Sequence, residues 1–184
     1  MTERTGEPRL PGDPDARQLV ERMIRVDHAG EYGARRIYEG QLAVLRGTAA
    51  EPEIRRMAAQ EQQHLDAFDR LVVERRVRPT ALSPVWHLAG YALGAASALL
   101  GPKAAMACTE AVEEVIDAHY QRQAAKLGPD EAALKQTIEE FRAHEIEHRD
   151  IPRAHGAREA PAYPALTGAV KAASRLAIWL SERI

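Results

Sequence analysis

Apolar and polar positions along this chain fall into helical segments separated by glycine and proline, and strand signals are nearly absent. Asp15 is a candidate N-cap and Gly47 a candidate helix stop, because these residue types favour the two ends of a helix. Prolines at positions 52 and 84 suit a first helical turn. The pattern predicts an all-α protein with helices over about 15–46, 52–77 and 84–100, a fourth ending near 127, a fifth around 145–148, and a sixth over about 164–182.

The third segment has an unusual polarity. No charged residue occurs from Pro79 to Pro102, and the run VWHLAGYALGAASALL within it is apolar but rich in glycine and alanine. About 20 apolar residues suffice to span a bilayer, so a transmembrane helix is one interpretation. Weak hydrophobicity, the internal His87 and the bounding prolines favour a helix that lies against a membrane surface, with plain core packing as the alternative.

The last predicted helix is amphipathic. Its apolar side chains recur at helical spacing, while Lys171, Arg175 and Arg183 lie elsewhere; the apolar set is Leu166, Val170, Ala173, Leu176, Ala177 and Leu180. Packing on the bundle explains this pattern, and a basic helix beside an uncharged one also suits an anionic lipid surface.

Composition narrows the class of protein. At 184 residues the chain is expected to form one domain over 15–184, preceded by a flexible, proline-containing arm over 1–14 that lacks the apolar core of a secretory signal. A net charge of -2 gives no basic footprint for nucleic acid. Cys108 is the only cysteine, which excludes an internal disulfide and fits a reducing compartment.

The candidate metal-binding residues follow a spacing that occurs twice in the chain. Glu31 precedes Glu61-x-x-His64 by 30 positions, and Glu113 precedes Glu145-x-x-His148 by 32. Residues three apart on a helix lie about 60° apart around its axis and about 4.5 Å apart along it, so each glutamate and histidine can reach the same ion. The gap is long enough for a turn and an antiparallel partner helix. The sequence therefore predicts six metal ligands inside a four-helix bundle: Glu31, Glu61, His64, Glu113, Glu145 and His148.

The ligand types indicate the metal. Four carboxylates balance two divalent cations, and oxygen ligands with two imidazoles suit iron or manganese, with zinc as a possible contaminant. One Glu-x-x-His string alone is usually a solvated helix face, but this chain has two such strings, each with an upstream glutamate at nearly the same distance. The sequence thus predicts a pair of iron or manganese ions, and the ligand set is that of a carboxylate-bridged di-iron centre, so the expected cofactor is two iron ions.

The two halves resemble a duplicated helical hairpin, and other residues repeat with them. Tyr38 and Tyr120 each follow the upstream glutamate by seven positions, close to two helical turns, so both are expected to line the cavity or to pack in the core. Asp27 and Asp117 lie four positions from Glu31 and Glu113, and are expected to accept from the free nitrogens of the two histidine ligands. His119 lies about 120° off this stripe, so it is expected to act on the substrate side or in proton transfer instead of as a metal ligand.

Several strings together resemble one known family. RVDHAGEYGARRIYEGQ, EQQH, RVRPTALSPVWHLAGYALGAASALLG, AMACTEAVEEVIDAHY, HEIEHRD and RLAIWLSERI are similar to the demethoxyubiquinone hydroxylases of ubiquinone biosynthesis, over about residues 19–184. Other di-iron proteins often carry aspartate just before each Glu-x-x-His, where this chain has Gln60 and His144. The hydrogen bonding around the ligands therefore does not carry over from those proteins.

The resemblance implies a ferritin-like di-iron monooxygenase that uses O2 to hydroxylate the ring of a polyprenylated demethoxyquinol. It implies that Glu61 and Glu145 bridge the two irons, that Glu31 and Glu113 are terminal, and that His119 and Tyr120 form a pair linked to activity. It further implies peripheral association with a membrane, expected to be the cytoplasmic face of a bacterial inner membrane. A lipid-binding accessory protein of the pathway and a homodimer are possible partners.

Two other functions use the same residues. A ferritin-like protein that oxidises or stores iron needs the same ligands, although the uncharged segment argues against the polar exterior of a soluble cage. A helical bundle whose acids and histidines are merely solvated needs no metal. The electron donor stays open between a separate reductase, NADH and the quinol itself, because the chain has no Gly-x-Gly-x-x-Gly string.

Overall fold

The computed structural model describes residues 14–184, so the predicted arm lies outside the described residues except for Pro14. Between residues 14 and 184 the protein contains no strand, which confirms the all-α prediction. Two short 3-10 turns, Pro129–Glu131 and Ala157–Glu159, connect the later helices. The six α-helices are α1 (Ala16–Val44), α2 (Glu51–Glu74), α3 (Ser83–Leu99), α4 (Pro102–Lys126), α5 (Ala132–Ala154) and α6 (Tyr163–Ser181).

Local chemistry explains where the helices begin and end. The side chain of Asp15 accepts from the backbone of Gln18, and the Gln18 side chain accepts in return from Asp15, which forms the capping box that starts α1. Gly47 and Gly101 take φ values of +76° and +108°, in the region that favours glycine, and both lie in the turns between helices. Helix α2 ends three residues earlier than predicted, because Arg76 takes a positive φ of 54° immediately after it.

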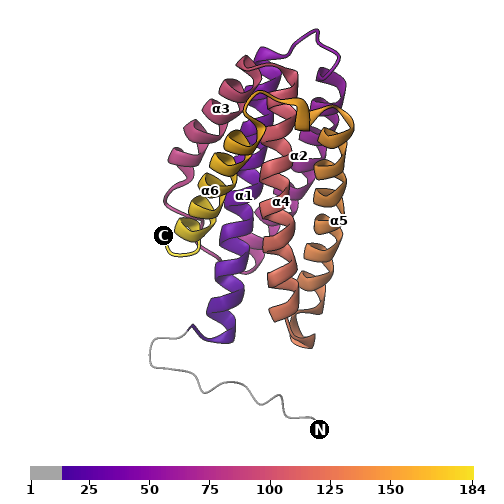
Figure 1. Cartoon of the computed structure of the whole chain (residues 1–184). Coiled ribbons are helices and arrows are strands. Elements are labelled where there is room, and N and C mark those ends of the chain that lie inside the picture. The colour runs from indigo at the N-terminus through magenta and orange to yellow at the C-terminus, as the bar shows by residue number, and fades with distance from the viewer. Residues whose placement is uncertain (1–13) are drawn as a thin grey trace.

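The helices form two similar groups of three (Figure 1). In the first group α2 and α3 both pack on α1, and in the second α5 and α6 both pack on α4. Helices α1 and α4 contact each other at the centre of the molecule, so that α1, α2, α4 and α5 form the four-helix bundle. The duplication therefore extends beyond the predicted hairpin to a third helix in each half.

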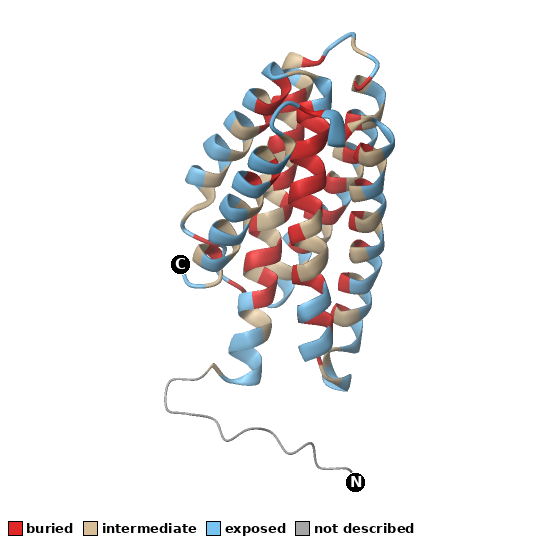
Figure 2. Cartoon of the chain, viewed as in Figure 1, coloured by how far each residue is buried: buried red, intermediate tan, exposed pale blue. Residues whose placement is uncertain are grey.

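The two larger hydrophobic clusters lie at the two ends of the bundle, and a smaller one joins α1, α4 and α6. One cluster lies where α1 ends and α2 and α4 begin, around Ile54, Met57 and Met106. The other lies where α1 and α5 begin, around Phe68 and Ile138. Figure 2 shows buried residues concentrated along α1 and α4, with the outer faces of the surrounding helices exposed. Any polar residue midway along the bundle is therefore enclosed by apolar layers on both sides.

Helix α3 packs so closely on α1 that the backbones of the two helices are in contact, which explains the glycines at their interface. A Cβ atom at Gly94 would lie 1.9 Å from the carbonyl oxygen of Ile37, and one at Gly40 would lie 2.2 Å from that of Tyr91. Only glycine leaves room for such a contact. The outer side of this segment is apolar and uncovered, with Leu88 and Leu99 71% and 75% exposed. Helix α3 therefore packs on α1 through one face and exposes an apolar surface on another, while its contact with a membrane stays a prediction.

Helix α6 divides in a similar way. Val170 is buried against α4, whereas Leu176 and Trp179 are 56% and 51% exposed. Within the described chain, no helix has both the length and the apolar content needed to cross a membrane.

Candidate metal centre

Six polar side chains meet midway along the bundle. Helix α1 contributes Glu31, α4 contributes Glu113, and α2 and α5 each contribute a glutamate and a histidine one helical turn apart, as the i, i+3 spacing predicts. Each of the six is at most 2% exposed. They form two overlapping groups whose candidate ligand atoms lie within 4.8 Å of one another: Glu31, Glu61, His64 and Glu145 in one, and Glu61, Glu113, Glu145 and His148 in the other.

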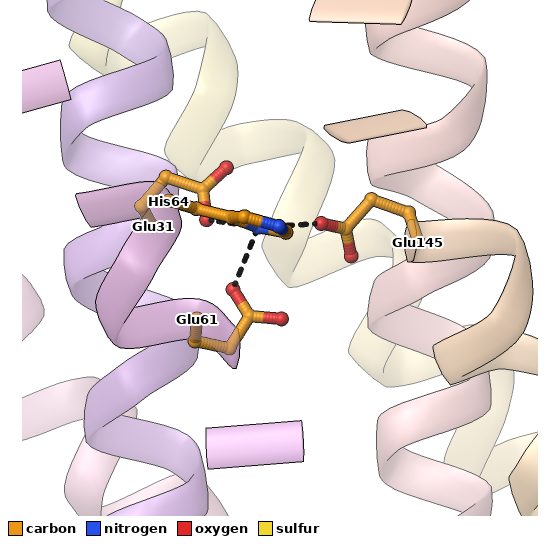
Figure 3. A group of neighbouring side chains, drawn as sticks. All are labelled: Glu31, Glu61, His64 and Glu145. Carbon is orange, nitrogen blue, oxygen red and sulfur yellow. Dashed lines mark ion pairs between the residues drawn. The ribbon is translucent and has the colours of Figure 1, made fainter. Parts of the chain in front are cut away.

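The first group surrounds one imidazole nitrogen. His64 Nδ1 lies 3.1 Å from Glu145 Oε1, 3.3 Å from Glu31 Oε2 and 3.8 Å from Glu61 Oε2. Figure 3 shows these side chains converging from α1, α2 and α5 on a common point. The group thus presents three carboxylates and one nitrogen to a single position.

The second group repeats this arrangement on the other half of the bundle. His148 Nδ1 lies 2.9 Å from Glu61 Oε1 and 3.7 Å from Glu145 Oε2, and Glu113 completes the group. Glu61 and Glu145 belong to both groups, with one oxygen of each near His64 and the other near His148. Two positions for cations are therefore adjacent and share two carboxylates.

The unpaired atoms show that these residues fit metal ions. Among the described residues, no hydrogen-bond partner is found for Nδ1 of His64 or His148, for either oxygen of Glu61 or Glu145, or for Oε2 of Glu113. Buried polar atoms without partners are costly and rare in folded proteins. Divalent cations would satisfy all of them, and a set of carboxylate oxygens with one imidazole per position suits iron, manganese or zinc.

Electrostatics of the cluster lead to the same conclusion. Burial raises the pKa values of Glu61, Glu113 and Glu145, and the first two rise well above their usual range because other carboxylates of the cluster lie nearby. Although burial alone lowers the pKa of His64, the carboxylates of Glu145 and Glu31, 3.1 Å and 3.3 Å from its Nδ1 atom, raise it to about 10. Without metal, the cluster thus holds protons that cations would displace.

The outward nitrogens of the two histidines are held by residues that sequence reasoning did not assign. His64 Nε2 lies 2.9 Å from Nδ1 of His144, and His148 Nε2 lies 3.0 Å from Oε1 of Gln60. Gln60 and His144 each precede a Glu-x-x-His string, and each reaches across to the imidazole of the other string. The sequence signal for these contacts was the position just before each Glu-x-x-His string, which many di-iron proteins fill with aspartate. These contacts leave Nδ1 of both rings free to bind metal.

The prediction that Asp27 and Asp117 would accept from these nitrogens is wrong. Asp27 lies 3.2 Å from His119 Nε2. Asp117 accepts hydrogen bonds from Arg142 at 2.6 Å and Arg149 at 3.2 Å. Each aspartate shares a helix face with a glutamate, as predicted, but its side chain contacts residues other than His64 and His148.

Both tyrosines of the repeat contact the cluster. Tyr38 of α1 donates to Glu113 Oε1 of α4 at 2.8 Å, and Tyr120 of α4 donates to Glu31 Oε1 of α1. Burial and the adjacent glutamate raise the pKa of each hydroxyl well above its usual value, so both remain protonated donors. Each tyrosine therefore holds one oxygen of the glutamate on the opposite helix.

Two cavities flank this centre. A groove of about 160 Å³ lies between α1, α3, α4 and α6, and its lining is largely apolar, including Gly30, Ala34, Val112 and Ile116. It passes behind the parts of α1 and α4 that carry Glu31 and Glu113. Trp86 of α3 donates to Ser181 of α6 at 3.0 Å among the residues that line this groove.

A second pocket, of about 400 Å³, has a different character. His119 and Trp179 line it together with four cationic side chains and one acidic side chain: Arg22, Arg122, Lys126, Arg175 and Glu182. Val26 and Ile178 line both cavities, so the apolar groove and this basic pocket are neighbours. The predicted residue His119 thus lies away from the six clustered residues, at the wall of the basic pocket.

Comparison with known proteins agrees with this architecture. Residues 18–181 match the family described as "Ubiquinone biosynthesis protein COQ7". The chain is 60% identical over 182 residues to the "3-demethoxyubiquinol 3-hydroxylase" of Rhodospirillum rubrum, covering 98% of this chain and 86% of that protein. It is 51% identical over 176 residues to the "NADPH-dependent 3-demethoxyubiquinone 3-hydroxylase, mitochondrial" of Homo sapiens, covering 94% and 81%. These matches span nearly the whole bundle, and the chain belongs to the ferritin-like COQ7 family of ubiquinone-biosynthesis proteins.

Proposed function

We propose that this protein is a di-iron, O2-dependent monooxygenase that hydroxylates the ring of a polyprenylated demethoxyquinol in ubiquinone biosynthesis. The observation that carries this proposal is the pair of buried carboxylate and imidazole groups that share Glu61 and Glu145 beside an apolar groove. The names of the relatives supply the reaction class, since they denote hydroxylases of demethoxyubiquinol or demethoxyubiquinone.

In this proposal the six clustered residues hold two iron ions. Glu61 and Glu145 would each serve both metal positions, because one oxygen of each lies near His64 and the other near His148. Glu31 and Glu113 would each serve one position, since a tyrosine already engages one oxygen of each. When bound, such a metal pair supplies the reduction of dioxygen, and the chain contributes ligand geometry and a cavity enclosed by apolar layers.

The apolar groove between α3 and α6 suits the polyprenyl tail of the substrate. Burial of each CH2 group contributes about 0.8 kcal/mol, so a tail in this groove would supply most of the binding energy. The groove lies along the α1 and α4 segments that carry Glu31 and Glu113. A bound tail would thereby hold the quinol ring close to the metal centre.

The exposed apolar side chains of α3 and α6 support peripheral association with a membrane. Leu88, Leu99 and Leu176 are all more than half exposed, and they belong to the two helices that border the groove. A lipid surface covering them would let the substrate enter from the bilayer without crossing water. We place the protein at the cytoplasmic face of a bacterial inner membrane. A second copy or a lipid-binding accessory protein would cover the same side chains.

The basic pocket suits a reduced pyridine nucleotide as electron donor. Several relatives are named as NADPH-dependent hydroxylases. Four cationic side chains in the pocket would pair with phosphates, and Trp179 offers a flat apolar surface. His119 and the adjacent Tyr120, proposed as the catalytic pair, lie between this pocket and Glu31.

Product analysis tests the proposed reaction. The protein would be loaded anaerobically with ferrous iron and then given a reductant, a short-chain demethoxyquinol and isotopically labelled dioxygen. We expect mass spectrometry to show one labelled oxygen in the ring, and Glu61→Ala to abolish it. Glu139→Ala, which changes an exposed glutamate of α5, is the matched control. Ferric mineral without hydroxylated product would instead identify an iron-storage protein.

A further inference from the structure

The two halves of the bundle match more closely than the metal cluster alone requires. Gln41 and Gln123 each lie ten positions after Glu31 or Glu113, and Asp27 and Thr109 each lie four positions before. Gln41 Nε2 reaches across to Thr109 Oγ1 at 3.2 Å. In the same way Gln123 Nε2 reaches across to Asp27 Oδ1 at 2.8 Å. The same glutamine contact therefore occurs on either side of the centre.

The symmetry fails at two positions, and both failures add polarity on the same side. The first is Asp27, which matches Thr109 of the other half. The second is His119, which matches Ile37, because each lies six positions after its glutamate. His119 Nε2 lies 3.2 Å from Asp27 Oδ1 and 2.9 Å from Gln123 Nε2. Three polar atoms thus form a closed triangle beside Glu31.

The corresponding position on the other side is apolar. Ile37 packs in a cluster with Ala111, Val112 and Val170 and lines the apolar groove. His119, in contrast, lines the basic pocket. Of these two matching positions beside the centre, only the one at His119 is polar and lines the basic pocket.

Burial of the Asp27 carboxyl group costs free energy of folding, which indicates that this residue has a specific role. It is 3% exposed, and among the described residues its Oδ2 atom has no hydrogen-bond partner. A carboxyl group in such a place destabilises the fold unless its partners compensate. Thr109, at the matching position, fills the same place with a hydroxyl that Gln41 satisfies.

We propose that Asp27, supported by Gln123, is a positioning residue that fixes the His119 imidazole between the basic pocket and the metal centre. In this arrangement reducing equivalents from the basic pocket reach the centre on the Glu31 side, past His119. This inference rests on the proposed function. In that reaction a ring C–H bond, O2, two electrons and two protons yield a ring C–OH bond and water. A reduced pyridine nucleotide in the basic pocket supplies both electrons and one proton as hydride, and solvent supplies the other proton.

The first test observes His119 directly and does not depend on activity. Nitrogen NMR of labelled histidine in the zinc-loaded protein reports the hydrogen bonding of each imidazole, with His119→Gln used to assign its signals. We expect Asp27→Asn to shift the His119 signals, while Thr109→Val, the matched change on the other side, leaves them in place. Unchanged His119 signals in Asp27→Asn would overturn the inference.

The second test measures how fast the oxidised iron centre is reduced by NADPH without oxygen, followed by loss of its absorbance. Asp27→Asn and His119→Gln should each slow reduction about tenfold or more, and the double variant should be no slower than His119→Gln alone. Thr109→Val should stay within about twofold, and all variants should retain wild-type iron content. Multiplicative effects in the double variant, or loss of iron in Asp27→Asn, would contradict a role exerted through His119. Failure of NADPH to reduce the wild-type protein would refute the proposed donor, and the NMR result would still decide the role of Asp27.

Discussion

Tyr38 of α1 donates a hydrogen bond to Glu113 of α4 at 2.8 Å, although 75 positions separate them in the chain. The reciprocal contact joins Tyr120 of α4 to Glu31 of α1. These two bonds cross the central helix pair in opposite directions. Each bond engages one carboxylate oxygen of Glu113 or Glu31 and leaves the other oxygen directed toward the cluster.

Removing the Tyr38 hydroxyl should weaken metal binding with little effect on the fold. Tyr38→Phe keeps the buried ring but frees Glu113, and loss of such a supporting contact typically costs about 10–100-fold in metal affinity. Competition with a chelator would measure the change. Tyr32→Phe, whose hydroxyl contacts His87 away from the cluster, is the control and should bind metal normally. Equal affinity in both variants would contradict this role for Tyr38.

Gln60 and His144 should both contribute to metal affinity, although their side chains are partly exposed. Gln60→Ala or His144→Ala removes the atom that orients His148 or His64, so iron affinity should fall by about 10–100-fold in either variant. Iron content after dialysis against a chelator measures this. Gln62→Ala, which breaks only a contact with Asp66 on the surface of α2, should retain its iron.

The metal-free protein should lose stability as pH rises above neutrality. The pKa of His64 rises on folding from 6.5 to about 10, and burial raises the pKa values of Glu61, Glu113 and Glu145. The lowered pKa values of His148 and His144 act in the opposite sense near pH 6.5, where an unfolded histidine titrates. From there up to about pH 10 the folded state keeps the His64 proton that the unfolded state has lost, so the free energy of unfolding falls as pH increases. Thermal melts across this range, with and without bound metal, measure the effect. Metal should reverse the trend, because cations replace the protons.

Close packing of α3 on α1 predicts contrasting effects of two glycine substitutions. Gly94→Ala places a methyl group 1.9 Å from the Ile37 carbonyl oxygen, so it must displace α3 and should destabilise the protein by about 1–3 kcal/mol or more. Gly168→Ala in α6 meets no atom within 4 Å and should be neutral or stabilise by up to about 1 kcal/mol. Chemical denaturation of both variants tests the comparison.

Charged substitutions on α3 should release the protein from membranes. Leu88→Asp and Leu99→Asp place a carboxylate on the exposed apolar side of α3, and we expect flotation with anionic liposomes to weaken clearly in each. Val73→Asp on α2 changes a side chain that is 76% exposed, close to the 75% of Leu99, and should float normally. If all three variants float like the wild type, these leucines do not contact lipid.

Most helix boundaries could be predicted from local chemistry, because caps and glycine stops act within a few residues. Asp15 starts α1 as predicted, and Pro84 lies in the first turn of α3. The end of α2 could not be predicted, since the positive φ of Arg76 leaves no signal in the residue type. Periodicity also predicted an amphipathic last helix, but it could not separate Val170, which faces α4, from Leu176, which faces outward.

By itself, the sequence determined which side chains share a face of their own helix. That was enough to predict the grouping of Glu61 with His64 and of Glu145 with His148, because helix geometry sets the i, i+3 relation. Only the tertiary structure decided what each face meets. Gln60 reaches His148 across 88 positions, and Asp27 meets His119 instead of a histidine of the cluster. The physical reason is that such contacts depend on how closely and at what angle helices pack, which no spacing within one helix determines.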